Sequence, residues 1–428
     1  MRWGRLLAVL GGAIGVGAAG AAAFVAANSY SALPDAASQP PASPELIARG
    51  EYLARAADCQ ACHDRVGGIP FAGGRPFALP FGTIYSTNLT PDRETGLGRW
   101  SDVAFLRAVR QGISKDGRHL YPAMPYSDYT GLSDADALAI KAYLMSLAPV
   151  HAPTPPNQLG FPFNQRWGVS FWNALFFKEG RFKPQPERSA DWNRGAYLAT
   201  SLGHCGQCHT PRNFAYGLSS DEFGGEEIQG WRAYNISSSK QHGVGGWSDE
   251  ELASYLKRGW APGRGVAGGP MAEVVHYSTS HLTPADTRAL VAYLKGTAPS
   301  DTGFALTTAP TARSRAALFA PADGDLRIGQ RLYAGACAGC HGYGGPANVP
   351  MATLIGAPGV NDPKPLNAIQ TVIHGVNVPT QGGRIFMPAY GHAYSDAEIA
   401  MLVRYVGASF GRPNQTTTDD VGKARRAQ

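Results

Sequence analysis

All six cysteines of this 428-residue chain lie in three copies of one pentapeptide, Cys-x-x-Cys-His. Two cysteines separated by two residues on a tight helical turn present both sulfurs to one edge of a planar ligand. The histidine that comes next in the sequence then lies beneath that ligand. This spacing is the attachment signature of c-type haem. The predicted thioether residues are Cys59, Cys62, Cys205, Cys208, Cys337 and Cys340, and the predicted proximal iron ligands are His63, His209 and His341. We therefore expect three covalently bound haem c groups.

Two other uses of paired cysteines fit less well. A structural zinc site needs a fourth ligand and usually a second paired motif. A thioredoxin-like redox motif needs alternating strand and helix patterns around it, which are not seen here. Because the flanking residues also repeat with each copy, haem attachment is the favoured interpretation.

Three methionines recur at one offset and are the predicted sixth ligands of the irons. Met124, Met271 and Met387 each follow by 12 residues a glycine predicted to end a helix, namely Gly112, Gly259 and Gly375. Each adjoins a proline, so each is expected on a stiff loop. A thioether opposite histidine raises the reduction potential of haem iron. With both axial positions filled, the irons are expected to pass single electrons and not to activate oxygen.

The remaining histidines show no repeated offset, so we expect surface or loop positions for them. They are His119, His151, His204, His242, His276, His281, His374 and His392. Trp100 and Trp247 each follow an asparagine (Asn88, Asn235) by 12 residues, and their indoles are candidates for haem propionate binding or for packing on the haem edge. Both asparagines stand in glycosylation-like sequons whose equivalent positions in the repeats indicate a structural role.

The helix signals repeat with the motifs. Capping residues Ser133, Thr283 and Ser395 open a closing helix in each unit, and Ser248 with Glu251 forms a capping box that Asn367 with Gln370 approximates. Tyrosines of the closing helices (Tyr143, Tyr293, Tyr405) are expected to pack on Gly50, Gly195 and Gly329, where the first and last helices cross. The fold class predicted is all-α, with three tandem class I cytochrome c-like domains at 45–150, 191–300 and 323–412.

The N-terminal 30 residues predict export. Arg2 and Arg5 precede 22 uncharged residues, from Leu6 to Ala27, which as a helix would span roughly 33 Å. This is long for a secretory signal, so a retained membrane anchor is favoured over a cleaved signal, although small residues would permit cleavage. Either interpretation exports the rest of the chain to the side of the membrane where haem is attached. With a retained anchor, the expected location is the periplasmic face of a bacterial cytoplasmic membrane.

Four segments join or follow the predicted domains. Residues 31–44 are a linker, residues 151–190 an aromatic and proline-rich linker, residues 301–322 a third linker, and residues 413–428 a loose polar tail. The stretch from Phe161 to Phe182 is expected either to join the first two domains or to lie on a membrane or partner surface. The net charge of +6 is spread along the chain without a dense basic run, so nucleic acid is not an expected partner.

The motifs and several phrases resemble membrane-bound triheme cytochrome c subunits of bacterial alcohol, aldehyde and sugar-acid dehydrogenases, over about residues 45 to 412. The phrases are Gly82–Asn88, Lys115–Arg118, Tyr121–Tyr126 and Gly203–Arg212. The resemblance implies a catalytic partner subunit containing molybdopterin, pyrroloquinoline quinone or flavin, with a small third subunit as a further candidate. It also implies delivery of electrons to ubiquinone. Thr371–Gly375 and Phe386–Tyr390 look closer to aldehyde dehydrogenase partners.

The function predicted is therefore electron transfer, with no substrate-oxidising site in this chain itself. Two alternatives remain open at this stage. One is a multihaem c-type enzyme such as a peroxidase, which would need a haem without a sixth ligand. The other is a cytochrome that donates electrons to a terminal oxidase.

Overall fold

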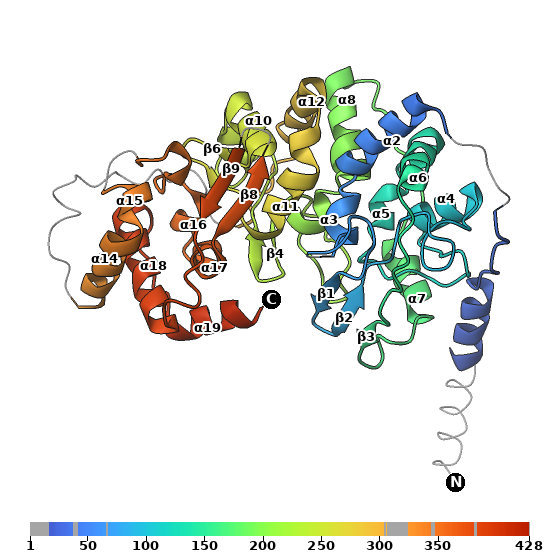
Figure 1. Cartoon of the computed structure of the whole chain (residues 1–428), viewed down its shortest axis with the longest axis horizontal. Coiled ribbons are helices and arrows are strands. Elements are labelled where there is room, and N and C mark those ends of the chain that lie inside the picture. Colours follow the sequence, from blue (N-terminus) through green and yellow to red (C-terminus); the bar gives the residue numbers. More distant parts are fainter. Residues whose placement is uncertain are drawn as a thin grey trace, which may run out of the picture. The chain divides into compact units, whose positions relative to one another are not determined.

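The computed structural model describes residues 17–36, 42–65, 67–303, 305, 324–343, 347–380 and 383–427. The chain forms two compact units, one of residues 1–50 and 65–182 and the other of residues 51–64 and 183–428. Both units consist of short helices, long loops and small antiparallel sheets (Figure 1). The linker predicted at 301–322 lies mostly outside the described residues, as does the start of the predicted anchor, residues 1–16. Residues 17–27 are helical, and among the described residues no helix has the length and apolar character needed to cross a membrane.

The first unit contains most of α2, which continues into the second unit. Its elements are α2 (Pro44–Ala56), β1 (Pro76–Leu79), β2 (Gly82–Tyr85), α4 (Asp102–Gln111), α5 (Tyr126–Tyr129), α6 (Asp134–Ser146), β3 (Gln158–Leu159) and α7 (Gly168–Phe176). The strands form one antiparallel sheet in the order β1-β2-β3, with Phe77 opposite Ile84 and Thr83 opposite Gln158.

The second unit holds all three Cys-x-x-Cys-His segments. Its N-terminal part comprises α3 (Cys59–His63), α8 (Ala190–Tyr197), a π-helical turn η1 (Leu198–Leu202), α9 (Gly206–His209), β4 (Glu226–Ile228), β5 (Trp231–Ala233), η2 (Val244–Gly246), α10 (Asp249–Arg258), β6 (Trp260–Ala261), β7 (Gly265–Val266), α11 (Gly269–Tyr277), η3 (Thr279–His281) and α12 (Pro284–Leu294). Its C-terminal part comprises α14 (Asp325–Ala336), α15 (Ala338–His341), η4 (Pro350–Ala352), α16 (Pro358–Asn361), α17 (Leu366–His374), β8 (Val376–Thr380), β9 (Gly383–Met387), α18 (Asp396–Phe410) and α19 (Thr418–Arg426).

Helix ends follow the predicted capping chemistry at most positions. The side chains of Ser133, Thr283 and Ser395 each accept a hydrogen bond from the backbone N–H three residues on. Ser248 and Glu251 form the reciprocal capping box. The prediction for Asn367 was wrong: α17 begins one residue earlier, and the Asn367 side chain instead exchanges two hydrogen bonds, of 2.7 and 2.8 Å, with the backbone of Arg232.

The first and last helices of each repeat cross at a glycine, as expected. A Cβ added to Gly195 would lie 1.9 Å from the carbonyl oxygen of Ala289 in α12, and one on Gly329 would lie 2.2 Å from that of Met401 in α18. The same holds for Gly50 against Ala139 in α6. Tyr293 and Tyr405 lie next to these crossings, with their Cβ atoms 2.7 Å from the position that such an added Cβ would occupy. Only glycine permits such close backbone approach.

Two expectations about regular structure were wrong. In the described residues, short strands form four small sheets in a chain expected to be all-α, because hairpins such as β8–β9 pair Val378 with Ile385 and bury both. The C-terminal tail is not loose: α19 buries Val421 and Ala424 among Ile369, Ile373 and Ile399. Its polar residues mark only the outer face of the helix, which is why composition alone predicted a loose segment.

Candidate haem sites

The second Cys-x-x-Cys-His segment forms the short helix α9 with its histidine held in one orientation. The Nδ1 atom of His209 lies 2.6 Å from the carbonyl oxygen of Tyr234, next to β5. Burial lowers the pKa of His209, so its imidazole is neutral near pH 7. A histidine that donates from Nδ1 to a carbonyl presents Nε2 as a lone-pair donor, which is the arrangement typical of iron and zinc ligands.

The third segment repeats this arrangement. His341 Nδ1 lies 2.6 Å from the carbonyl oxygen of Ala352 in η4, and burial lowers its pKa as well. Tyr333 of α14, which is buried, donates a 2.6 Å hydrogen bond to the carbonyl of Gly342, just after the motif. The two segments therefore use the same bond between the proximal histidine and the backbone, which the sequence did not reveal because the acceptors are main-chain atoms.

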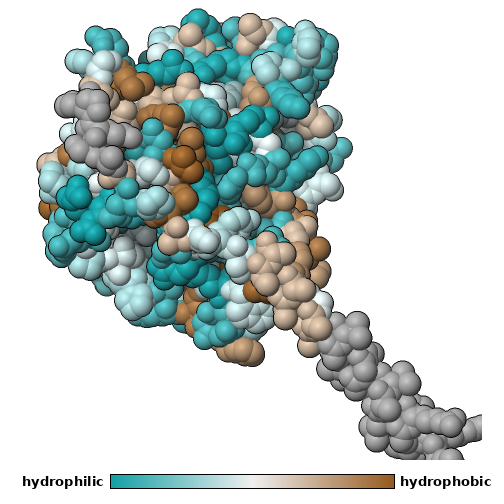
Figure 2. Space-filling view, turned by 90° about the vertical axis from the view of Figure 1, so that its right-hand side faces the viewer, coloured by the Kyte–Doolittle hydropathy of each residue, from teal (hydrophilic) through white to brown (hydrophobic). Residues whose placement is uncertain are grey.

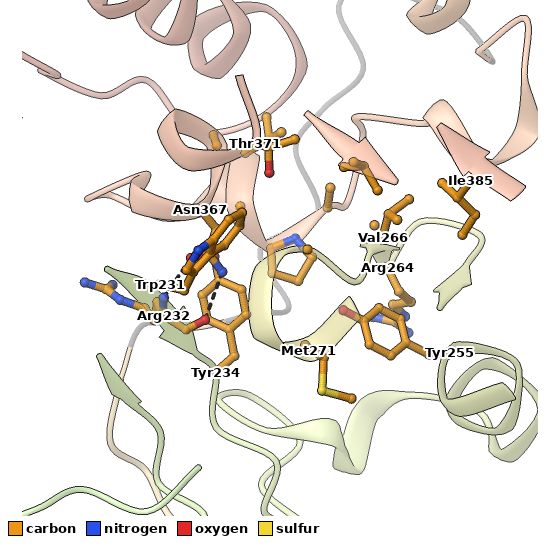
Figure 3. A pocket seen from close by; sticks show the side chains of 18 of the residues that line it. Trp231, Arg232, Tyr234, Tyr255, Arg264, Val266, Met271, Asn367, Thr371 and Ile385 are labelled. Atoms are coloured by element: carbon orange, nitrogen blue, oxygen red, sulfur yellow. Dashed lines mark hydrogen bonds between the residues drawn. The ribbon is translucent and has the colours of Figure 1, made fainter. Parts of the chain in front are cut away.

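One apolar cavity of about 480 Å³ connects the second and third segments. Both cysteines and the histidine of each motif line its wall: Cys205, Cys208, His209, Cys337, Cys340 and His341. Figure 3 shows Trp231 and Tyr234 on one side of this cavity, Tyr255 and Arg264 on the other, and the Met271 side chain between them. An apolar cavity of this kind, with paired thiols and an imidazole on its wall, fits a covalently attached porphyrin.

The predicted methionine ligands occupy different kinds of backbone. Met271 and Met387 both line the cavity, but Met271 lies in the first turn of α11 and Met387 ends β9, so the prediction of stiff loops was wrong for both. Pro270 does not exclude a helix because proline is tolerated at its first turn, where N–H groups have no helical partner. Met124 lies in a turn before α5, as expected.

The first segment, Cys59–His63, forms α3 of the second unit, whereas Met124 belongs to the first unit. Asp58 immediately precedes Cys59 and has left-handed backbone geometry, with φ of 52°. The assignment of His63 and Met124 as an axial pair therefore stays a prediction from the sequence.

The surroundings of the six cysteines are consistent with the haem interpretation. No disulfide joins any of the six cysteines, all of which lie in the described residues. In that same part of the chain, no group of three or more His, Cys, Asp or Glu side chains could hold a metal ion such as zinc.

The residues flanking the sites separate into structural and cavity-lining groups. Asn235 is buried, with its Oδ1 atom accepting hydrogen bonds from the Ser237 backbone N–H and hydroxyl, while its amide donates to the Ser300 carbonyl. Asn88 makes the equivalent bonds to Thr90 and the Val150 carbonyl. Both sequons are therefore structural, as predicted.

Trp247 lines the cavity, with the Arg264 guanidinium stacked 5.0 Å from its ring.

Two histidines expected at the surface or in loops have interior partners. His119 is buried, and its Nε2 atom lies 3.0 Å from both the Asn28 carbonyl and the Ser170 hydroxyl. His204 lines the cavity next to Cys205. Nothing in the spacing distinguished these two from the other histidines, because their partners come from distant segments.

Comparison with known proteins decides the family. The model of the cytochrome c family matches residues 47–148, and that of subunit III of cbb3-type cytochrome c oxidase matches residues 324–406. The gluconate 2-dehydrogenase cytochrome c subunit of Pantoea cypripedii is 38% identical, over 90% of each chain. The fructose dehydrogenase cytochrome subunit of Gluconobacter japonicus is 37% identical, over 89% of this chain and 82% of its own.

This chain belongs to the dehydrogenase cytochrome c subunits. A nicotinate dehydrogenase subunit of Pseudomonas putida is also similar, with 41% identity over 86% of this chain, but the chain spans only 30% of that relative's length. As a member of this family, this cytochrome c subunit is an electron-transfer component, and cytochrome c domains carry covalently bound haem c. Its relatives are subunits of dehydrogenases, which implies a catalytic dehydrogenase partner.

Proposed function

We propose that this chain is the triheme electron-transfer subunit of a membrane-bound periplasmic dehydrogenase. A catalytic subunit oxidises an aldehyde or alcohol, and the cytochrome subunit passes the electrons singly to ubiquinone. The observation that carries the proposal is the continuous cavity lined by the second and third Cys-x-x-Cys-His segments. Two haems attached to the two segments that line one cavity would lie next to each other, as a relay requires.

The side chains of this subunit have binding and tuning roles in that relay. The haems supply the one-electron chemistry. Cys205, Cys208, Cys337 and Cys340 would hold two of them, and His209 and His341 would ligate iron in orientations fixed by the carbonyls of Tyr234 and Ala352. Met271 and Met387 would supply thioether sulfur, which favours the reduced state. The apolar wall excludes water, which also raises the potential.

A surface of the first unit supports attachment to a membrane. The helix at residues 17–27 is joined to α7 by stacking of Phe24 on Phe171, with ring centroids 4.8 Å apart. Around α7, four large apolar side chains are exposed: Phe161, Phe163, Trp167 and Leu175, with exposed fractions of 81, 47, 53 and 75%. We call these four residues the α7 surface. Figure 2 shows hydrophobic residues where the helix at residues 17–27 meets the rest of the chain.

The charged residues that follow the α7 surface are mostly basic, which suits the headgroup region of a membrane. Lys178 and Arg181 follow α7 and are exposed, and Glu179 is the one acidic residue between them. Aromatic side chains favour the boundary between lipid and water, and basic side chains favour anionic headgroups. The α7 surface and the N-terminal helix would thus contact the same leaflet.

Purification from native membranes in mild detergent tests the function directly. We expect three haems per chain by pyridine haemochrome, low-spin spectra, a co-purifying catalytic subunit, and reduction of the cytochrome by aldehydes or alcohols in isolated membranes. Fewer than three haems per chain, or a high-spin haem that reacts with peroxide, would contradict the proposal. The second outcome would favour a multihaem enzyme.

A further inference from the structure

The residue before the first cysteine has unusual backbone geometry in two of the three attachment segments. His204, before Cys205, has φ of 39°, and Asp58, before Cys59, has φ of 52°. In the third segment the equivalent Ala336 is the last residue of helix α14. Left-handed geometry is costly for residues with a Cβ and is kept where the surroundings determine it. The first two segments therefore share a constrained turn that the third lacks.

The constraint at His204 has a visible cause, because its imidazole reaches the other constrained segment. The ring hydrogen-bonds to its own backbone and to the backbone of Ala57, a buried residue two positions before Cys59. The preceding carbonyl, that of Ala56, accepts a 3.3 Å hydrogen bond from the Ser278 hydroxyl. Two successive carbonyls ahead of the first attachment segment are therefore bound by the region that carries the second.

The imidazole of His204 stays neutral in this position. Burial lowers its pKa to about 4. A neutral imidazole has one N–H and a carbonyl can only accept a hydrogen bond, so the ring is the donor toward the Ala57 carbonyl and toward its own. His204 therefore has a fixed role as donor across the physiological pH range.

We propose that His204 is a positioning residue that fixes the first haem-attachment segment against the second. The hydrogen bond completes a short covalent and hydrogen-bonded route from Cys59 through Asp58 and Ala57 to His204 and Cys205. This inference rests on the proposed function, in which both segments carry haem. When one electron crosses between the two haems, one iron is oxidised and the other reduced, and His204 neither gains nor loses a proton.

Other contacts in the second unit would keep the two segments near each other in a His204 variant. The Tyr52 hydroxyl donates a 2.5 Å hydrogen bond to Asp286 of α12, and Arg194 of α8 binds both carboxylate oxygens of Asp286 at 2.7 and 2.8 Å. Arg55 lies 3.4 Å from His281. We therefore expect His204 variants to fold. They should differ from the wild type mainly in how closely the first attachment segment is held against the second.

The test compares His204→Leu with two amide variants in the purified full chain. His204→Asn and His204→Gln place an amide N–H near the positions of Nδ1 and Nε2, and asparagine also tolerates the left-handed conformation. The matched control is His242→Leu, because the His242 ring also bonds a backbone carbonyl, that of Gly303 at 3.2 Å, far along the chain from any cysteine. Haem content and redox titration first establish that each variant keeps three haems.

Pulse reduction with less than one electron per chain then reports how fast the electron redistributes among the haems. We expect His204→Leu to slow one redistribution phase about tenfold, the lower end of the effect of losing an outer-shell partner. One amide variant should restore that phase, and His242→Leu should leave it unchanged. Wild-type rates in His204→Leu, or slowing that neither amide restores, would overturn the inference. A wild-type chain with fewer than three haems would instead overturn the proposed function, before any variant is compared.

Discussion

The guanidinium of Arg232, on β5, lies 2.9 Å from both carboxylate oxygens of Asp362, whose side chain is completely buried. This ion pair joins the part of the second unit that carries the second motif to the part that carries the third. Asp362 also accepts a 2.8 Å hydrogen bond from the Lys364 backbone N–H. The carboxylate is therefore desolvated, and the Arg232 guanidinium is the larger of two cationic influences on it, the other being Lys364.

Replacing the arginine should destabilise the protein. Arg232→Leu leaves a buried carboxylate without its cation, which costs about 3 kcal/mol of unfolding free energy. Thermal and denaturant unfolding of the holoprotein would measure this loss. The double variant Arg232→Leu/Asp362→Leu should recover much of it, and a double variant as unstable as the single one would contradict the explanation.

The same pair predicts a pH dependence. Burial raises the pKa of Asp362 to about 6, despite the neighbouring Arg232 guanidinium, from an ordinary value of 3.8. Between these values the folded state binds more protons at this site than the unfolded state, so the site's contribution to stability falls as the pH rises from about 4 to about 6. Asp362→Asn removes this contribution. The difference in unfolding free energy between wild type and Asp362→Asn should therefore change over that range, and a constant difference would show that the carboxyl does not titrate there.

The helix crossings can be tested within one helix. Gly329→Ala places a methyl group against the Met401 carbonyl and should destabilise the protein by about 3 kcal/mol, the upper end of the cost of overpacking. Gly335, in the same helix α14, has no atom within 4 Å of the position that a Cβ would take, so Gly335→Ala should be neutral or stabilise by about 0.5–1 kcal/mol. Shifts in the unfolding midpoint compare the two. Equal shifts would mean that helix propensity, and not close packing, determines the effect.

Replacement of the predicted methionine ligands should change haem potentials. Met271→Leu and Met387→Leu retain cavity volume but remove the thioether, so each should lower the potential of one haem by at least about 60 mV, a tenfold change for a one-electron couple. Met145→Leu, in α6 and partly exposed, is the matched control. Spectroelectrochemical titration gives the potentials. Unaltered titrations in both cavity variants would remove the ligand assignment.

The α7 surface predicts the strength of membrane attachment. Replacing Phe161, Trp167 and Leu175 with serine removes apolar area that lipid would cover, at about 1.5–3 kcal/mol for each fully covered side chain. The triple variant should leave native membranes at a lower urea concentration than the wild type. Phe214→Ser is the control because Phe214 is fully exposed but lies in the second unit. Equal release of the triple variant and this control would show that the α7 surface does not contact lipid.

Local chemistry was predictable from the sequence where it depends on neighbouring residues. The caps at Ser133, Thr283 and Ser395 use a side chain and a backbone N–H three residues apart, so their pattern is visible without a structure. The crossing glycines were predictable because each lies in a similar helical stretch 8 to 10 residues before a Cys-x-x-Cys-His motif. Repetition made three weak signals into one reliable expectation.

Interactions between distant segments were not predictable in this way. Asn367 carries a plausible capping pattern, yet its amide pairs with the backbone of Arg232, 135 residues away in sequence. Met271 was expected on a loop because it follows proline, and the helix α11 that contains it depends on packing against β8 and β5. The tail helix α19 has a polar composition, and only its contact with α17 and α18 shows that Val421 belongs to the core.

The shared cavity also has a consequence for biogenesis. The walls around the second and third motifs are apolar and line one cavity, so a porphyrin at either motif would form part of the packing around the other. A chain that has received only one of these two groups would expose the remaining hollow to water and would be a substrate for proteases. Haem attachment at one motif and correct folding around the other would thus depend on each other. Chains that carry only one of the two haems should be short-lived in the cell.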